Sequence, residues 1–136
     1  MRVYFDSSAL LKRTLREAES EALEREVRRH VDMGSDLFSS SLTWVEVTRS
    51  LRARLDAEPP TVIAALIEET LLSIAESPIS TPVIDIARRL GPSTLRSLDA
   101  IHLATATLLG ADLICAYDQR MLTAAAELGF STISPA

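Results

Sequence analysis

Short apolar runs alternate along the chain with longer stretches whose apolar residues recur at helical spacing. The runs at 3–5 ("VYF") and 113–117 ("LICAY") contain no charged residue, which is typical of strands covered on both faces of a parallel sheet. In contrast, Leu98, Ile101 and Leu108 fall on one helical face. The pattern predicts strands at 2–6, 36–40, 112–117 and 130–134, a weak strand near 78–81, and helices at 8–15, 19–33, 43–56, 60–75, 82–90, 97–109 and 119–128.

The order of these elements predicts the fold class. Because strands alternate with helices, we expect an α/β fold: a three-layer α/β/α sandwich with a mostly parallel central sheet. At 136 residues the chain has the length of one domain, and no repeat, low-complexity segment or linker divides it. The stretch "AEPPT" at 57–61 reads as a break between two helices. We therefore predict a single domain over residues 1–136.

Charge and composition narrow the choice of partner. The net charge of −5 disfavours the broad basic surface that binds duplex DNA without regard to sequence. Thirteen of the fourteen basic residues are arginine, whose planar guanidinium suits phosphate, so nucleic acid is not excluded. All four glycines follow a predicted helix, as helix C-terminal caps do. None is left for a phosphate-binding loop, which excludes the common nucleotide-binding fingerprints.

The single cysteine and the absence of a long apolar run indicate the compartment. Cys115 has no second cysteine to pair with, and it lies in an apolar run, so we expect a buried thiol in a cytoplasmic protein. The apolar start of the chain stops at Asp6, unlike a signal peptide. No run approaches the roughly 20 residues that span a bilayer.

Four acidic residues from distant parts of the chain are predicted to meet at one end of the sheet. In a parallel sheet, ligands bind outside the carboxyl ends of the strands. Asp6 and Asp118 each end a predicted strand, and Glu46 and Asp99 each lie in the first turn of a helix that begins at that end. Asp112 begins its strand, so we expect it at the opposite end.

Three of these acids also have a purely structural interpretation. Thr43 and Glu46 have the spacing of a capping box. Ser97 could cap the helix that contains Asp99, where the helix dipole favours an acid. Asp118 could be the N-cap of the helix that follows it. Taken one at a time, these acids do not require a functional site.

The structural interpretation is weaker for Asp6 and for the four acids together. Ser7 or Ser8 could cap the first helix without the cost of burying a charge. Four carboxylates within a few ångströms repel one another by roughly 1–4 kcal/mol per close pair. A hard cation would neutralise them, and oxygen ligands without sulfur or imidazole suit Mg²⁺ or Mn²⁺.

For three further polar residues the sequence allows either a structural or a functional role. Ser8 could cap its helix or contact a bound phosphate. His102 follows Asp99 by three residues and could approach the acids, although packing or hydrogen bonding is the more common role of such a residue. His30 is expected on a solvated helix face.

Four segments carry a resemblance to a known family. They are the opening "VYFDSSALLK", then "SSLTWVEV", "SLDAIHLATA" and "LICAYDQRML". In order and spacing they resemble PIN-domain ribonucleases, specifically the VapC toxin family of type II toxin–antitoxin systems, over the whole chain. Asp6 matches the acid after the first strand, Glu46 the acid in the helix after the second strand, Asp99 the acid of the "LDA" motif, and Asp118 the acid after the late strand. Many relatives carry a threonine just before this last acid, where the present chain reads "AY".

The resemblance implies a PIN-like fold and a metal-dependent endoribonuclease. It implies Mg²⁺ as the cofactor, with Mn²⁺ able to substitute, and hydrolysis of RNA phosphodiester bonds by a metal-activated water. Asp6, Asp99 and Asp118 would be direct or water-bridged metal ligands, and Glu46 would position the water or a second ion. The implied partners are RNA and a small VapB-like antitoxin protein, with the toxin as a homodimer or in a heterotetramer with its antitoxin.

Three other classes are weighed against this interpretation. A phospho-receiver domain needs an acidic pair near the first strand and a late lysine, but Asp6 is followed by Ser7 and the only lysine is Lys12. A non-catalytic PIN-like binding module has no need of all four acids. A DNA flap nuclease of similar fold would be longer, with basic helical insertions.

Overall fold

A five-stranded parallel sheet forms the centre of the molecule. The computed structural model describes all 136 residues. The strands are β1 (Arg2–Phe5), β2 (Asp36–Ser40), β3 (Ala75–Ser77), β4 (Leu113–Cys115) and β5 (Ser131–Ile133), in the order β3-β2-β1-β4-β5. Every neighbouring pair is parallel. The order changes direction between β1 and β4, which is the switch point where α/β sheets bind their ligands.

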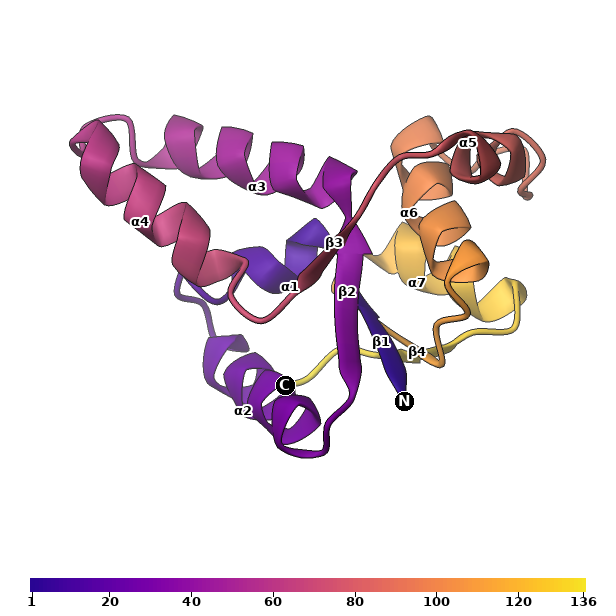
Figure 1. Cartoon of the computed structure of the whole chain (residues 1–136), viewed down its shortest axis with the longest axis horizontal. Coiled ribbons are helices and arrows are strands. Elements are labelled where there is room, and N and C mark those ends of the chain that lie inside the picture. The colour runs from indigo at the N-terminus through magenta and orange to yellow at the C-terminus, as the bar shows by residue number, and fades with distance from the viewer.

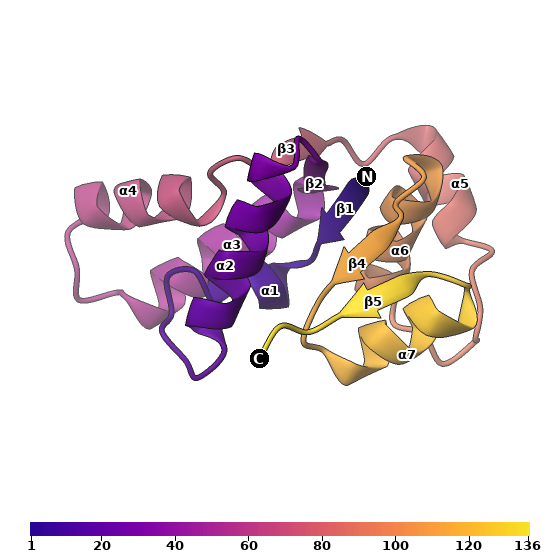
Figure 2. The same ribbon diagram turned by 90° about the horizontal axis from the view of Figure 1, so that it is seen from below.

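Seven helices cover the two faces of the sheet. They are α1 (Ser7–Leu11), α2 (Ser20–Asp32), α3 (Ser41–Arg54), α4 (Pro60–Thr70), α5 (Thr81–Ala87), α6 (Ser97–Leu108) and α7 (Gln119–Glu127). Helices α1, α2 and α3 pack on one face, with α4 beside α3. Helices α6 and α7 pack on the other, with α5 beside α6 (Figure 1). Seen from below, α7 lies along the edge strand β5 (Figure 2). The predicted α/β/α sandwich is confirmed, and its sheet is entirely parallel.

Two hydrophobic cores lie on opposite faces of the sheet. Because successive strand residues point to opposite faces, Val3 and Phe5 enter the core under α1–α3, whereas Tyr4 enters the core under α6 and α7. Leu51 is fully buried in the first core and Leu103 in the second. The uninterrupted apolar runs therefore reflect strands buried on both sides.

Two helix boundaries and one strand differ from the sequence prediction. The first helix ends at Leu11, and α4 ends at Thr70 instead of extending to residue 75. The weak strand near 78–81 is wrong, since β3 occupies Ala75–Ser77. The chain turns at Ser73, whose φ is 69°, and Leu71 and Ile74 enter the core on either side of the turn instead of continuing the helix.

The residues that cap α1 and α3 also differ from the prediction. Asp6 itself caps α1, because its Oδ1 accepts a hydrogen bond from the Ala9 amide at 3.0 Å. Helix α3 begins at Ser41, and the Ser40 hydroxyl oxygen accepts from an amide of the first turn at 3.1 Å. Thr43 therefore lies inside the helix and forms no capping box.

Two further predictions about helix ends are wrong. Arg96, not Ser97, occupies the N-cap position of α6, and its side chain makes no capping bond. Helix α5 ends at Ala87, and Gly91 does not have the positive φ of the other three glycines, so it is not the C-terminal cap of that helix.

His30 and Cys115 are both fully buried, and only the burial of Cys115 was predicted. His30 is fully buried, contrary to the prediction, and its Nε2 lies 3.0 Å from Oε1 of Glu26. Cys115 is fully buried, as predicted, and burial raises the pKa of its thiol. None of the helices is both long enough and apolar enough to cross a bilayer.

Candidate active site

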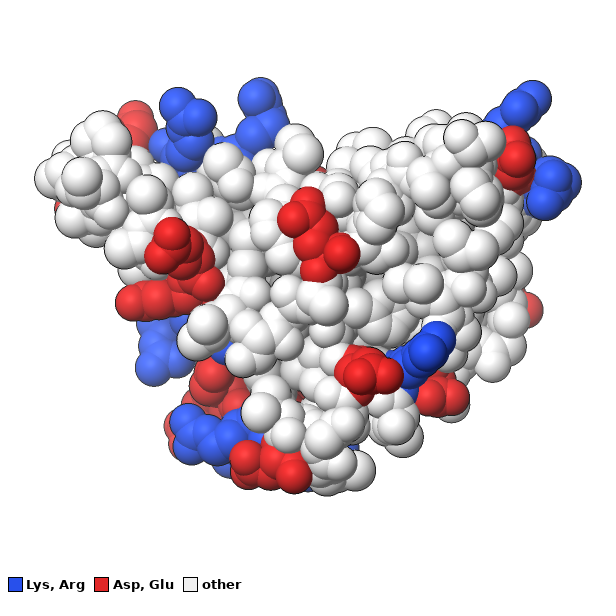
Figure 3. Space-filling model, in the orientation of Figure 1, with Lys and Arg blue, Asp and Glu red and all other residues white.

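The carboxyl ends of the strands lie between two helical lobes. In Figure 1 this end is at the top, with α3 and α4 on one side and α5 and α6 on the other. Figure 3 shows the surface hollowed at the same edge, with Lys and Arg side chains over α3 and over α5 on either side. Asp6 directly follows β1, and Asp118 follows β4, so these two acids flank the switch point of the sheet.

The other two acids reach this end from helices. Glu46 lies in the second turn of α3 and not, as predicted, in the first, because the helix already starts at Ser41, where β2 ends. Asp99 lies in the first turn of α6, as predicted. The charges of Glu46 and Asp118 both act on the pKa of Asp99, and that of Glu46 acts on Asp6. Asp112 is at the opposite end, where its Oδ2 accepts from the Arg2 amide at 2.8 Å.

Asp6 is held in place by two hydrogen bonds to one of its oxygens. Oδ1 accepts from the Ser8 hydroxyl at 2.7 Å and from the Ala9 amide at 3.0 Å. The side chain is buried, with 3% of the residue exposed. Burial raises the pKa of Asp6 to about 6, the nearby charge of Glu46 acts in the same direction, and the two hydrogen bonds oppose the rise. The carboxylate is therefore rigidly placed and costly to ionise without a counter-charge.

Ser8 joins the loops that follow β1 and β4. Its hydroxyl donates to Asp6 and accepts from the Tyr117 amide at 3.0 Å. Tyr117 directly precedes Asp118, so this one hydroxyl sets the spacing between the segments that carry two of the acids. Ser8 does not cap α1, so that alternative is wrong, and contact with a bound phosphate stays a prediction.

A chain of hydrogen bonds from the core orients Glu46. Its Oε1 lies 2.6 Å from Nε2 of His102 and accepts from the Ser7 hydroxyl at 3.3 Å. Nδ1 of His102 lies 2.5 Å from the hydroxyl of Tyr4, which accepts from the Ser40 amide at 3.4 Å. In the neutral tautomer with the proton on Nε2, His102 donates to the Glu46 carboxylate and its Nδ1 accepts from the tyrosine. Every donor in this chain points toward Glu46.

Asp99 and Asp118 occupy more open positions. Asp99 is half-buried; burial raises the pKa of its carboxyl, the charge of Asp118 adds to the rise, and Arg96 opposes it. Asp118 is exposed and caps α7 as predicted, with Oδ1 accepting from the amides of Arg120 at 2.9 Å and Met121 at 3.3 Å.

Each of the four carboxylates keeps at least one oxygen without a protein donor. The hydrogen bonds to Asp6 and Asp118 all reach Oδ1, those to Glu46 reach Oε1, and Asp99 accepts none. No group of three or more acidic, histidine or cysteine side chains has an arrangement that could by itself hold a metal ion. Mg²⁺ does not require such a group, since it is usually held by one or two carboxylates and keeps several waters. The donor set therefore fits a hydrated hard cation.

Sequence reasoning identified the acids but missed the residues that support Glu46. The sequence predicts that His102 could approach the acids, but it does not reveal that Tyr4 contacts His102 or that Ser7 contacts Glu46. The alternation along β1 places Tyr4 on the α6 face, and this was the available signal. It could not show that residues 98 positions apart in the chain form a hydrogen bond.

Comparison with known proteins identifies the family. The sequence model of the PIN domain matches residues 3–127. Ribonuclease VapC46 of Mycobacterium tuberculosis is 43% identical over 136 residues, which cover 98% of this chain and 97% of the relative. This chain belongs to the VapC family of PIN-domain ribonucleases. Ribonuclease VapC47 of the same species, another family member, is 38% identical over 135 residues, covering 98% and 96% of the two chains.

Solved structures share the fold of this family member. VapBC2 from Rickettsia felis, which was crystallised with a DNA fragment from its promoter, superposes with a TM-score of 0.78 at 8% identity and full coverage of both chains. The Mycobacterium tuberculosis toxin VapC20, which cleaves the sarcin–ricin loop, gives a TM-score of 0.69 at 15% identity, covering 98% and 99%. At such low identity these likenesses establish the fold alone.

Proposed function

We propose that this chain is the toxin of a type II toxin–antitoxin pair and acts as a metal-dependent endoribonuclease in the cytoplasm. Membership of the VapC ribonuclease family supports the activity. The observation that carries the residue assignment is the set of four carboxylates at the switch point, each with an oxygen free of protein donors. Burial raises the pKa of both Asp6 and Asp99, which is the electrostatic situation that a bound cation relieves.

Asp6, Asp99 and Asp118 are proposed to hold the cation directly or through water. Mg²⁺, or Mn²⁺ in its place, would supply a nucleophilic water near neutral pH and stabilise charge on the attacked phosphate. Asp6 presents its free Oδ2 from a fixed position, because Oδ1 is anchored by Ser8 and Ala9. Glu46 presents its free Oε2 and would orient the attacking water, with His102 fixing its direction. Attack by water leaves a 5′-phosphate and a 3′-hydroxyl, without use of the 2′-oxygen.

The cleavage assay tests this assignment. Purified protein should cut single-stranded RNA in Mg²⁺ or Mn²⁺ and stop in EDTA. Asp6→Asn and Asp99→Asn should each abolish cleavage, whereas Asp112→Asn, at the opposite end of the sheet, should retain it. A loss of activity in Asp112→Asn equal to the other two would refute the placement of the site. A folded protein with no metal-dependent cleavage of any RNA would instead favour the non-catalytic binding module.

The second partner is proposed to be a small antitoxin protein of the VapB kind. Helices α3 and α4 enclose a groove of about 490 Å³, whose apolar lining includes Ile63 and Ile67. Such a groove fits the apolar face of a partner helix, and a basic side chain of the same partner would be attracted to the four acids. Co-expression with the neighbouring reading frame should yield a complex on size-exclusion chromatography, as a heterotetramer or around a toxin homodimer. Recovery of the free chain alone would count against this partner.

A further inference from the structure

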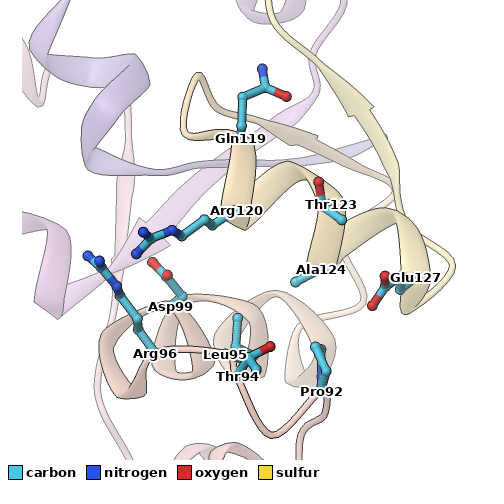
Figure 4. A pocket seen from close by; sticks show the side chains of 10 residues that line it. All are labelled: Pro92, Thr94, Leu95, Arg96, Asp99, Gln119, Arg120, Thr123, Ala124 and Glu127. Atoms are coloured by element: carbon cyan, nitrogen blue, oxygen red, sulfur yellow. The ribbon is translucent and has the colours of Figure 1, made fainter.

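A second cleft opens beside Asp99. It lies between the first turns of α7 and the segment that leads into α6, and its volume is about 640 Å³. That volume falls within the range of about 300–1,000 Å³ of small-molecule sites. The residues that line it, shown in Figure 4, are Pro92, Thr94, Leu95, Arg96, Asp99, Gln119, Arg120, Thr123, Ala124 and Glu127.

Two arginines face each other at one end of this cleft. Arg96 comes from the N-cap position of α6 and Arg120 from the first turn of α7, so each is placed by a different element. In Figure 4 both guanidinium groups lie near the carboxylate of Asp99, Arg96 reaching it from α6 and Arg120 from α7. Neither side chain forms an ion pair or donates a hydrogen bond anywhere in the protein, so their donors face the cleft unused.

The two ends of the cleft differ in charge. Glu127 lies at the far end from the arginines, with Thr123 and Ala124 between them (Figure 4). A phosphate group would be attracted to the arginine end and repelled from Glu127. The carboxylate of Glu127 can accept a hydrogen bond from an amino group on the edge of a base, as acidic side chains do toward cytosine. The cleft therefore has a positive end that suits the phosphate of a nucleotide and a negative end that suits an amino group of its base.

The walls between these ends suit a base rather than a second phosphate. Leu95, Ala124 and Pro92 supply apolar surface, and the hydroxyls of Thr94 and Thr123 supply polar contacts. No aromatic ring lines the cleft, so a base would pack on the apolar side chains of Leu95 and Ala124 instead of stacking on a ring.

We propose that this cleft binds one nucleotide of the RNA substrate next to the scissile phosphate. The backbone phosphate lies between Arg96 and Arg120, and the base points toward Glu127. Arginine forks bind phosphate oxygens in pairs, which fixes the strand as well as attracting it. This inference rests on the proposed ribonuclease function, because Asp99 joins the cleft to the proposed metal site.

A simpler role for the arginines would be to neutralise Asp99. Arg96 does lower the pKa of Asp99, in opposition to burial. That role predicts that replacing the arginines alters the metal requirement and pH profile of cleavage but leaves RNA binding in the absence of metal unchanged. The proposed subsite predicts the reverse, a loss of RNA affinity and a raised KM with a smaller change in kcat.

RNA binding is measured on the Asp6→Asn protein in EDTA, so that no cleavage occurs. The probe is a mixed-sequence pool of fluorescein-labelled single-stranded oligoribonucleotides, followed by fluorescence anisotropy over a range of salt concentrations. Arg96→Gln and Arg120→Gln should each weaken binding roughly five- to tenfold. Each should also reduce the slope of log affinity against log salt by about 0.7, the value for one lost phosphate contact on a single strand.

One control variant separates a specific contact from overall charge. Arg28→Gln changes the net charge by the same amount on exposed α2, where the arginine has no ion pair, and should alter affinity by less than about twofold. Unlabelled nucleoside monophosphates compete for the cleft if one nucleotide is enough to occupy it.

The outcomes distinguish the two proposals. The proposed subsite would be overturned if Arg96→Gln and Arg120→Gln had the same RNA affinity and the same salt dependence as Arg28→Gln. It would also be overturned if the parent showed no measurable binding of the RNA pool. If the unmodified protein cleaves RNA while these variants keep its KM, only the subsite fails. If the unmodified protein never cleaves RNA, the proposed function fails, whatever the arginine variants bind.

Discussion

Replacement of Asp6 by asparagine should stabilise the metal-free protein at neutral pH. Burial raises the pKa of Asp6 from 3.8 to about 6, so the folded state holds this proton more tightly than the unfolded chain does. Between those two values the folded state binds more protons, and the free energy of unfolding therefore falls as pH rises through this range. Above about pH 6 the full cost of the buried charge is present, and below about pH 4 it is absent.

The size of the effect follows from the pKa and the hydrogen bonds. A tenfold change in proton affinity is worth about 1.4 kcal/mol, so ionised Asp6 lowers the stability by roughly 3 kcal/mol. Asparagine caps a helix as well as aspartate does, and its Oδ1 can still accept from Ser8 and Ala9. Allowing about 1 kcal/mol for the weaker hydrogen bonds of a neutral amide leaves a net gain of about 2 kcal/mol. For a chain of this size that gain raises Tm by roughly 6–10 °C.

Thermal melts in EDTA across the pH range measure this difference. The Asp6→Asn protein should exceed the parent in Tm at pH 7.5 and equal it near pH 4, while Asp112→Asn should track the parent at both values. Addition of Mn²⁺ should reverse the order, because cation at about a hundred times its Kd stabilises the protein that binds it by about 2.7 kcal/mol. An Asp6→Asn protein that is less stable than the parent by the same amount at both pH values would refute the reasoning. Asp6 would then be a helix cap whose burial costs little.

Three other outcomes are expected. In EDTA, Asp118→Asn should be at least as stable as the parent, because relief of the repulsion between Asp118 and the other acids outweighs the roughly 0.3–1 kcal/mol of lost charge–dipole interaction. In Mn²⁺ it should be less stable than the parent, because it lacks one proposed ligand. Thermal melts in which added metal does not change this order would mean that Asp118 is only a helix cap. Tyr4→Phe should lower the free energy of unfolding by about 1–3 kcal/mol in urea titrations, because it leaves Nδ1 of His102 buried without its hydrogen-bond partner. The same substitution should slow cleavage; an unchanged cleavage rate would show that the Tyr4–His102 hydrogen bond does not help to orient Glu46. Cys115 should not react with a thiol-specific chromogenic disulfide until the protein unfolds, because the thiol is buried and its pKa is raised; fast reaction in native buffer would contradict this.

The fold and the positions of the acids along it were accessible from the sequence. Strands buried on both faces must be apolar throughout, and helices that cover them must be apolar on one face, so both leave patterns that a single chain displays. The direction of parallel strands then decides which end each acid occupies. This reasoning placed Asp6 and Asp118 at one end and Asp112 at the other, as the structure has them.

Several neighbouring residues have side chains that could cap the N-terminus of a helix, and the fold determines which of them does so. Asp6, Ser7 and Ser8 can each cap a helix, and the choice depends on which residue lies extended at the end of β1. The strand ends at Phe5, so Asp6 becomes the cap and Ser8 is free to bridge to the loop after β4. The same reason moves the cap of α3 to Ser40, where β2 ends.

Contacts between distant segments were decided by tertiary structure alone. The pairs Tyr4–His102 and Glu46–His102 join residues 98 and 56 positions apart, and the cleft at Asp99 exists because α7 packs beside the start of α6. A pattern of hydrophobic and polar residues records which face of an element is buried, but it does not record which side chain of another element that face meets. The sequence alone therefore determined the sheet and the end of it where the acids lie. Packing determined how Glu46 is oriented and which arginines stand beside Asp99, because both depend on distances between elements that only the folded chain sets.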